Sequence, residues 1–466
     1  MNTPIFHIES VDLDAQGISH YDDGKVVFID QALPNELISA EITRKKPSFE
    51  KAKIIERLNE STYRVKPGCQ HYGVCGGCSM QHMDMGLQIA LKQRALEDQL
   101  WHLGKVKTEG VLSPVVGPSW HYRHRARLSA KFVLKKNKML LGFHEKNSSY
   151  VADLEMCKIL AEPVASMMPR LRELLSQLSI YMQLPQVEIA VGDHTTALVF
   201  RILSALTPQD ELHLKQFIDQ QTFPLQVWLQ PGGPSTINLF HQNSSAPLSY
   251  DHPEFGVSID FLPTDFTQVN HSMNRVLVKK AIDLLDVKTN HRVLDLFCGI
   301  GNFTLPLAKR AKEVVGIEGS DALTTRAQQN AHRNQLINVS FLARNLFEAA
   351  DHKHQQELIS LGYFDRWLID PPREGALALI KLLSQCINHT ESIENEDGII
   401  QTQTIVASCP DIRPEKIVYV SCNPSTLARD AGLLVHRAGY RLVSAGISNL
   451  FPHTSHVESI AVFERV

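Results

Sequence analysis

The sequence lacks long hydrophobic runs and any marked excess of charge of one sign. No stretch approaches the roughly 18 consecutive apolar residues of a transmembrane helix. The start, MNTPIFHIESVDLDAQG, has neither the basic residues nor the apolar core of a signal peptide. These two absences predict a cytoplasmic protein with no membrane partner. The net charge of −3 over 466 residues argues against a globally basic nucleic-acid binder.

Cysteine is scarce and unevenly distributed. The chain has eight cysteines, and because cytoplasmic thiols stay reduced, metal binding or catalysis explains them better than disulfides. Cys69, Cys75 and Cys78 lie in one glycine-rich loop, and Cys157 stands alone farther along. Three thiolates in one loop and one from a distant segment form the ligand set of a four-iron cluster. A structural zinc site and a thioredoxin-like CxxC are the alternatives, although no βαβ pattern flanks the CxxC.

The chain is too long for one core, and its patterns divide it into three parts. Residues 1–60 alternate apolar and polar positions between turn signals, which predicts a small β-barrel. Residues 61–262 combine the cysteine loop, a helix over 86–104 and an α+β pattern. In 263–466 strands alternate with helices, which predicts an α/β domain with a mostly parallel, doubly wound sheet. The polar stretch 388–414 has no pattern and predicts a long surface loop.

The stretch VLDLFCGIGNFTLPLA, residues 293–308, predicts a ligand-binding turn. A strand ends at Asp295, a glycine-rich turn follows and a helix begins, so backbone N–H groups face the crevice at the carboxyl ends of the strands. A dinucleotide site is disfavoured because the third glycine of GxGxxG is absent. The next strand ends in Glu318, where a carboxylate can accept both hydroxyls of an adenosine ribose. Together these features resemble the cofactor site of S-adenosylmethionine-dependent methyltransferases.

Two further strand ends carry reactive groups. The strand RWLID runs into DPPREG, which contains Asp370 and resembles the acidic-proline motif of these methyltransferases; a tight turn is the alternative. In VYVSCNPSTLARD a β-branched run stops at Asn-Pro, so the thiol of Cys422 is expected at the end of a strand. A small apolar filler is the alternative for this cysteine.

Positive charge is concentrated in two short runs. HYRHRARLSAKFVLKKNK, residues 121–138, holds seven Lys and Arg and no acid, and RKKPSFEKAK, residues 44–53, is also basic. An RNA-binding surface and a solvated face both fit such runs.

The order of motifs along nearly the whole chain resembles the RNA uracil-5-methyltransferases, in particular the RlmD type that acts on 23S ribosomal RNA. The motifs are CQHYGVCGGC, YRHRARLS, DFTQVN, DLFCGIGNF, DPPREGA, VYVSCNPSTLARD and FPHTSHVES. The resemblance implies that residues 1–60 form a TRAM domain, an RNA-binding barrel of the OB kind. It also implies an iron-sulfur (4Fe-4S) cluster on the four cysteines, S-adenosylmethionine as cofactor and ribosomal RNA as substrate. The 388–414 stretch is longer than this family leads us to expect.

The resemblance also implies roles for individual residues. Carbon 5 of uracil is a poor nucleophile until a thiolate adds to carbon 6, which is the task implied for Cys422. Glu458 is the implied base that removes the carbon 5 proton, with His453 and His456 as alternatives. Phe266 is expected either to stack on a displaced base or to lie in the core. The implied cofactor residues are Gln268, Phe297, Asn302, Glu318, Asn345 and Asp370.

Two other functions fit parts of the sequence. A transfer-RNA uracil-5-methyltransferase would share the methyltransferase half. The resemblance to that branch does not extend to the barrel or to the four-cysteine site, which argues against it. A non-catalytic RNA-binding or ribosome-assembly factor would not need Cys422, Glu458, Gln268 and Asp370, all of which are present. We therefore expect methylation of carbon 5 of a specific uridine in 23S ribosomal RNA through a covalent cysteine adduct.

Overall fold

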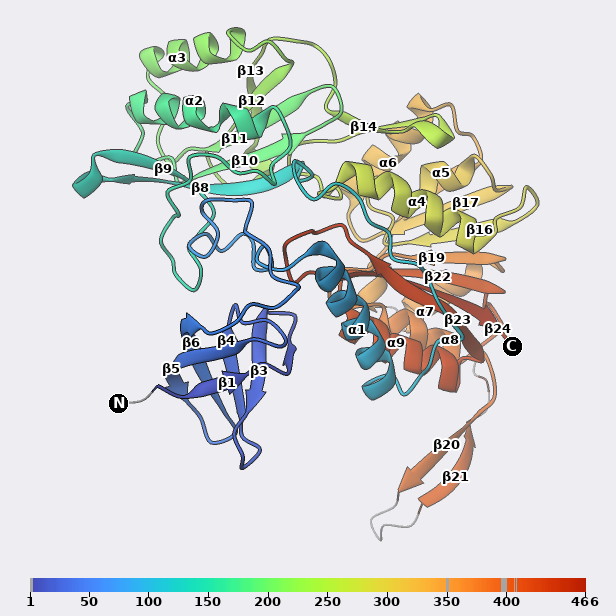
Figure 1. The fold of residues 1–466 in the computed structure, drawn as a ribbon. Coiled ribbons are helices and arrows are strands. Elements are labelled where there is room, and N and C mark those ends of the chain that lie inside the picture. Colours follow the sequence, from blue (N-terminus) through green and yellow to red (C-terminus); the bar gives the residue numbers. More distant parts are fainter. Residues whose placement is uncertain (1–2, 349–351, 395–399, 406, 408) are drawn as a thin grey trace.

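The computed structural model (Figure 1) describes residues 3–348, 352–394, 400–405, 407 and 409–466. The strands of the described residues form three larger sheets and two separate hairpins. Within these ranges no helix is both long and apolar enough to cross a bilayer.

The N-terminal part folds as a six-stranded sheet around a small apolar core. Its strands lie in the order β1-β5-β6-β4-β3-β2, and neighbouring strands are antiparallel except for β4 and β6. Alternate residues of β4 are buried, and Ile8, Val27, Ile29 and Ile38 fill the interior, as the alternating sequence requires. The strands are β1 (Ile5–His7), β2 (Ser10–Val11), β3 (Gln16–His20), β4 (Val26–Asp30), β5 (Leu37–Lys45) and β6 (Phe49–Arg57).

The cysteine loop leads into the long helix α1 (Met85–His102). Asp84 caps this helix, because its side chain accepts a hydrogen bond from Leu87 N at 2.7 Å. The helix packs on α9 (Pro424–Arg437), next to which it lies in Figure 1. Just beyond the end of α1, Gly104 approaches α9 so closely that a Cβ would lie 2.4 Å from the Ala428 oxygen. The helix predicted over 86–104 is therefore present, and it lies against the C-terminal half.

The middle of the chain forms a second six-stranded sheet, in the order β13-β12-β11-β10-β8-β9. Buried residues of α2 and α3, such as Leu171 and Leu214, share one core with Leu128 and Ile189 of the sheet. The hairpin of β14 and β15 connects this sheet to the C-terminal half. The bounds are β8 (Arg125–Val133), β9 (Lys138–Gly142), α2 (Val164–Gln177), β10 (Gln186–Val191), β11 (Thr196–Arg201), α3 (Pro208–Asp219), β12 (Leu225–Gln230), β13 (Asn238–Gln242), β14 (Ser249–His252) and β15 (Val257–Asp260).

The C-terminal half is built on an eight-stranded sheet, in the order β18-β17-β16-β19-β22-β24-β23-β7. The strands from β18 to β22 are parallel, β24 is antiparallel to both of its neighbours, and β7 pairs in parallel at the edge. Helices α1, α8 and α9 cover one face, and α4, α5 and α6 cover the other. The doubly wound, mostly parallel sheet predicted from the sequence is thus confirmed.

The elements of this half are β7 (Gly110–Val111), α4 (His271–Leu285), β16 (Arg292–Leu296), α5 (Thr304–Ala308), β17 (Glu313–Glu318), α6 (Asp321–Arg333), β18 (Val339–Ala343), α7 (His352–Ser360), β19 (Arg366–Ile369), α8 (Leu377–Ser384), β22 (Lys416–Ser421), β23 (Tyr440–Ser448) and β24 (Glu458–Arg465).

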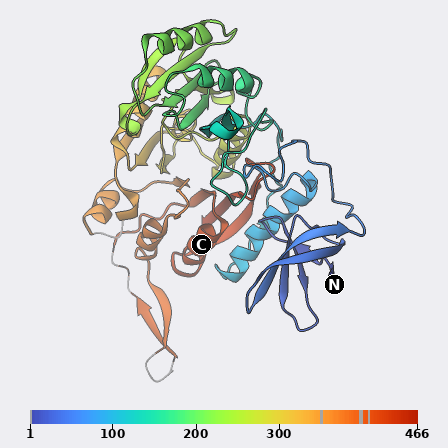
Figure 2. The same ribbon diagram turned by 90° about the vertical axis from the view of Figure 1, so that its left-hand side faces the viewer.

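The stretch 388–414 is not the patternless loop that the sequence predicted. Its strands β20 (His389–Glu394) and β21 (Ile400–Ile405) pair as an antiparallel hairpin that projects from the sheet (Figures 1 and 2). Residues 395–399, 406 and 408 lie outside the described part of the chain. The prediction was wrong because it relied on apolar alternation, whereas HTESIE and IQTQTI favour extended backbone through their Thr and Ile residues.

Candidate active site

Cys422 lies at the junction of β22 and α9, where the local sequence fixes its backbone. Asn423 caps α9, because its side-chain oxygen accepts a hydrogen bond from Ser425 N at 3.1 Å. The side-chain nitrogen of Asn423 donates to the Arg373 carbonyl at 3.0 Å, and its backbone N–H donates to Ser421 Oγ at 3.1 Å. The half-buried thiol therefore stands at a rigid strand end, where the sequence placed it.

The register of the sheet brings Glu458 opposite this cysteine. Strands β22 and β24 are antiparallel with Ser421 paired to Ser459, so Cys422 and Glu458 are the next opposed positions. Glu458 is 3% exposed. Asp370 follows β19, the neighbour of β22 on the other side. Three reactive groups therefore meet where the neighbouring strands β19 and β22 end and β24 begins.

Burial and charge couple these three groups. Burial, followed by the charges of Glu458 and Asp370, raises the pKa of the Cys422 thiol to about 11, while Arg373 acts in the opposite direction. Burial also raises the pKa of Asp370 to about 7. Burial and the charge of Asp370 hold the pKa of Glu458 well above its usual range. The charged forms of all three groups are therefore disfavoured by burial, and nearby positive charge, such as that of Arg373, favours the Cys422 thiolate.

The glycine turn between β16 and α5 is held by two carboxyl groups. The Glu318 carboxylate accepts a hydrogen bond from Gly299 N at 3.2 Å. Asp295 is fully buried and accepts a hydrogen bond from Thr304 Oγ1 at 2.5 Å, and burial raises the pKa of Asp295 to about 8. The turn needs left-handed backbone at Gly299 and Gly301, whose φ angles are 55° and 96°. The predicted strand, turn and helix are present, with Glu318 beside the turn.

Asn302 in this turn is tied to other parts of the protein. Its side-chain oxygen accepts hydrogen bonds from Tyr250 OH at 3.1 Å and from Asn274 Nδ2 at 2.8 Å, and His252 Nε2 lies 3.2 Å from it. Tyr250 and His252 belong to β14, and Asn274 belongs to α4. Asn302 therefore anchors the turn, and its contact with a cofactor stays a prediction.

The remaining predicted cofactor residues lie around the same strand ends. Gln268 is half-buried in the loop between β15 and α4. The neighbouring Phe266 is 70% exposed, so the core alternative for this ring is wrong. Phe297 has left-handed backbone with a φ of 65°, and its ring lies 5.6 Å from that of Phe347. Asn345 follows β18 and lines a pocket formed by residues of β17, β18 and α7.

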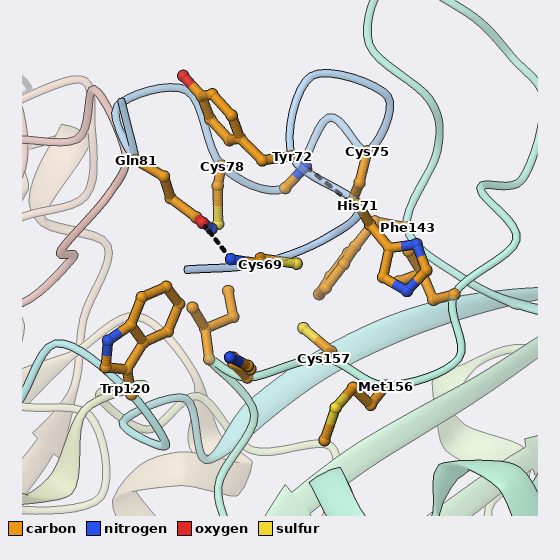
Figure 3. A pocket seen from close by; sticks show the side chains of 14 residues that line it. Cys69, His71, Tyr72, Cys75, Cys78, Gln81, Trp120, Phe143, Met156 and Cys157 are labelled. Carbon is orange, nitrogen blue, oxygen red and sulfur yellow. Dashed lines mark hydrogen bonds between the residues drawn. The ribbon is translucent and has the colours of Figure 1, made fainter. Parts of the chain in front are cut away.

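The four cysteines that were predicted to hold a cluster line one largely apolar pocket (Figure 3). Cys69, Cys75 and Cys78 come from the loop before α1, and Cys157 reaches the pocket from the segment between β9 and α2. Trp120 forms part of the wall. Across the described ranges, no set of three or more His, Cys, Asp or Glu side chains is arranged to hold a metal ion. The thiols thus line the same pocket, but they are not arranged around a single metal position.

Backbone contacts shape the cysteine loop. Gly77 N donates a hydrogen bond to Cys75 Sγ at 3.4 Å. A Cβ on Gly76 would lie 3.1 Å from the His144 carbonyl oxygen, so a larger residue would press on the backbone just after β9. Burial raises the pKa of the Cys78 thiol to about 12. This thiol holds its proton unless a positive ion offsets the burial.

The basic run of residues 121–138 does not act as one surface. Arg127 is exposed beside Glu188. Arg125 instead donates hydrogen bonds to the carbonyls of Pro263, at 2.7 Å, and Asp265, in the loop that carries Gln268. This contact joins segments that are remote in the sequence, which is why the run itself gave no sign of it.

Sequence reasoning missed two basic residues near this site. Arg373, within DPPREG, lowers the pKa of Cys422 against the effect of burial. Lys92 on α1 is 1% exposed and shares the buried stripe of that helix with Gln88 and Leu96. The one available signal was that Gln88 and Lys92 occupy apolar positions of the helical pattern, and the prediction from the sequence did not use it.

The fold is that of the S-adenosylmethionine-dependent methyltransferases. The crystal structure of Pyrococcus abyssi tRNA (uracil-54, C5)-methyltransferase in complex with S-adenosyl-L-homocysteine matches with a TM-score of 0.70 and 20% identity. The match covers 99% of this chain and 100% of that chain. Fold and site therefore define a class of protein that has the fold of this methyltransferase and a thiol at the end of a strand.

Sequence comparison narrows this class to one family. A model of the tRNA (uracil-5-)-methyltransferase family matches residues 86–388. The protein named 23S rRNA (uracil(1939)-C(5))-methyltransferase RlmD of Cupriavidus metallidurans is 52% identical over 100% of this chain and 95% of the relative. The protein of the same name from Ralstonia pickettii is 52% identical over 98% of each chain. The chain belongs to the RNA uracil-5-methyltransferase family and is an enzyme of that family.

Proposed function

We propose that the enzyme methylates carbon 5 of a uridine in 23S ribosomal RNA, at the position that the names of its relatives give as uracil 1939. The register of β22 and β24, which opposes Cys422 and Glu458, is the observation that carries the proposal. A thiol opposite a buried carboxyl suits a reaction in which a nucleophile adds to carbon 6 and a base later removes the carbon 5 proton.

In this mechanism Cys422 is the nucleophile and Glu458 is the base. The Cys422 thiolate adds to carbon 6 of a uracil that has been flipped out of its stack, which makes carbon 5 nucleophilic. After methylation, the Glu458 carboxylate accepts the proton from carbon 5. The electron pair of that C–H bond re-forms the double bond between carbons 5 and 6 as sulfur leaves carbon 6. The raised pKa of Glu458 makes its carboxylate a stronger base than an exposed glutamate.

The residues around the glycine turn fit S-adenosylmethionine, which supplies an electrophilic methyl group when bound. Asp295 Oδ1 is buried and has no hydrogen-bond partner within the described part of the chain, so this edge has an unused acceptor. Glu318 is assigned to the ribose hydroxyls, Asn345 to the adenine, and Gln268 and Asp370 to the end nearest Cys422. The further residues assigned to the cofactor are Phe297 and Asn302.

The four pocket thiols are assigned to a 4Fe-4S cluster. They line one pocket from two separate segments, and Gly77 N already points at the Cys75 sulfur, as donors do around cluster sulfurs. A four-iron cluster spreads its ligands over its corners, so it does not require three thiols close around a single ion. Anaerobically purified protein should be brown and contain about four irons per chain. Stoichiometric zinc without visible absorbance would contradict this assignment.

The N-terminal sheet is assigned the role of a TRAM-type barrel that binds RNA. Arg44, Lys45 and Lys46 are exposed at the end of β5, and Arg127 and Lys131 are exposed on β8. Exposed cations on these two parts of the chain suit a phosphate backbone. We propose the division into an RNA-binding barrel over 1–60, a central cluster and RNA-binding domain over 61–262, and a catalytic domain over 263–466.

Mapping of 5-methyluridine in 23S ribosomal RNA tests the proposed function. Cells without the gene should lack the modification at uracil 1939, and wild-type protein should restore it while Cys422→Ala should not. Transfer RNA from the same cells is the control and should be unchanged. A modification that persists in 23S RNA, or that disappears from transfer RNA, would contradict the proposal.

A further inference from the structure

A buried lysine on α1 holds the segment 449–453, which leads into β24 and Glu458. Lys92 Nζ donates hydrogen bonds to Asn449 Oδ1 and to the Phe451 carbonyl, both at 2.8 Å. Both acceptors are neutral oxygens. Because burying an ammonium group without a negative partner costs folding free energy, Lys92 at this position calls for a reason other than stability.

The same segment is held at His453 by α1 again and by the cysteine loop. Gln88, one turn before Lys92 on α1, accepts a hydrogen bond from His453 N at 2.9 Å through its side-chain oxygen. From the cysteine loop, Ser79 N and Met80 N both donate to the His453 carbonyl, at 2.9 and 3.0 Å. His453 has a φ of 66°, a left-handed backbone that residues other than glycine rarely adopt. These hydrogen bonds therefore maintain a conformation that the chain would not keep alone.

The neighbouring carbonyls of the segment are also occupied. Asn270 Nδ2 donates to the Leu450 carbonyl and Tyr122 OH donates to the Pro452 carbonyl, each at 3.0 Å. Donors from α1, the cysteine loop and two other segments thus converge on five consecutive residues, 449–453. The start of β24 is consequently fixed from outside the sheet.

We propose that Gln88 and Lys92 are positioning residues for Glu458, which they hold opposite Cys422 by fixing the main chain of 449–453. This inference rests on the proposed function of Glu458 as the base. Cys422 is held by its own junction of strand and helix, so loss of Lys92 should leave addition to carbon 6 in place and slow the removal of the carbon 5 proton. Displacing a catalytic group by about 1 Å can cost up to about a hundredfold in rate.

The variant Lys92→Met tests this inference, with Lys280→Met as a matched control. Lys280 on α4 also donates from Nζ to a backbone carbonyl, that of Ser113 at 2.8 Å, on a different part of the sheet. Lys92→Met should lower kcat by about ten- to a hundredfold with little change in KM. A methylated covalent enzyme-RNA complex should accumulate on denaturing electrophoresis. The control should behave as wild type, and both variants should keep their Tm because Met fills the space of the lysine stem.

Amide hydrogen exchange provides a readout that does not depend on RNA. Exchange of residues 453–458 should rise by about tenfold in Lys92→Met and not in Lys280→Met, which corresponds to a loss of roughly 1.4 kcal/mol of local stability. Asn449→Ala removes only one of the two acceptors and should give a smaller effect of the same kind. Unchanged exchange with normal turnover would overturn the inference. If Lys92→Met lowers the Tm and slows addition, methyl transfer and elimination equally, the inference is overturned as well. Wild-type enzyme that fails to act on 23S RNA would refute the proposed function, while the exchange data would still decide whether Lys92 fixes the segment.

Discussion

The thiol of Cys422 and the four thiols of the pocket are held in opposite ways. Cys422 stands between a central strand and the first turn of a helix, where sheet hydrogen bonds and the Asn423 cap fix it. The pocket cysteines come from loop segments on two sides, as Figure 3 shows. A thiol that is fixed by local structure can act singly as a nucleophile. Thiols that converge from loops depend on a bound group to keep them together.

Replacing Cys422 should affect only the thiol that is fixed by local structure and should leave the four pocket thiols unchanged. Cys422→Ala should abolish methyl transfer and every covalent protein-RNA adduct, because no nucleophile remains, while the iron content stays that of wild type. Cys409→Ala removes another half-buried thiol and should keep full activity. Single-turnover methylation and denaturing electrophoresis measure both effects. An adduct formed by Cys422→Ala would overturn the assignment of the nucleophile.

Replacing Glu458 should separate the two chemical steps at the same strand ends. In Glu458→Gln addition and methyl transfer proceed but elimination stalls, so a methylated covalent complex should accumulate. RNA with 5-fluorouridine at the target should trap wild-type enzyme in the same way, because fluorine does not leave as a proton. If Glu458→Gln turns over normally, the base is His453, His456 or water.

Replacing Cys157 should affect the pocket thiols, which converge from separate loops. Cys157→Ser should lose iron and lower the Tm, because ligation joins two segments that are far apart in the sequence. Visible absorbance, iron analysis and thermal unfolding measure the change. Cys422→Ala is the control and should retain its iron. A Cys157→Ser protein that keeps four irons per chain, the number expected of a cubane cluster, would remove this cysteine from the ligand set.

Acid should weaken the contact between the middle sheet and the C-terminal half without altering the protonation of Cys422. Burial lowers the pKa of His124 and of His252 to about 4, and the His124 ring stacks on His271 at 4.1 Å. The unfolded chain binds these protons below a pKa of about 6.5 and the folded chain does not, so stability falls as the pH drops from about 6.5 to about 4. The slope is about 1.4 kcal/mol per pH unit for each histidine. Denaturant midpoints that are equal at neutral pH and in acid would contradict this.

The smallest effect is expected at the exposed lysines on β8 and just after it, which lie outside both thiol sites. Replacing Lys131, Lys135 and Lys136 by Ala should weaken RNA binding and flatten its salt dependence, because fewer counterions are released. Arg125→Ala is the contrasting variant, since Arg125 holds the loop of Gln268 and should affect cofactor affinity more than RNA affinity. Equal salt slopes for the triple variant and wild type would show that these lysines are only solvated.

The sequence predicted those parts of the site in which one short segment determines the geometry. The glycine turn after Asp295 and the strand end at Cys422 follow from local rules of strands, turns and caps. The Arg125 contact to the Asp265 carbonyl and the hold of Lys92 on Phe451 join remote segments, and no local pattern encodes them. The hairpin β20–β21 escaped prediction for a different reason, because polar strands lack the alternation by which strands are recognised.

The edge strand β7 and the helix α1 come early in the chain, but they pack on a sheet whose other strands all come from residues 292–465. Gly110 of β7 pairs with Ser444 of β23, and α1 covers α9. During synthesis these early segments must wait for partners that emerge only after the whole middle sheet has been made, so long-range contacts should make folding slow. Strand β24, which begins with Glu458, lies between β22 and β23 in the sheet, although it follows both of them in the chain. A nascent chain that has not yet reached β24 therefore lacks the proposed base, whatever part of the site it has already folded.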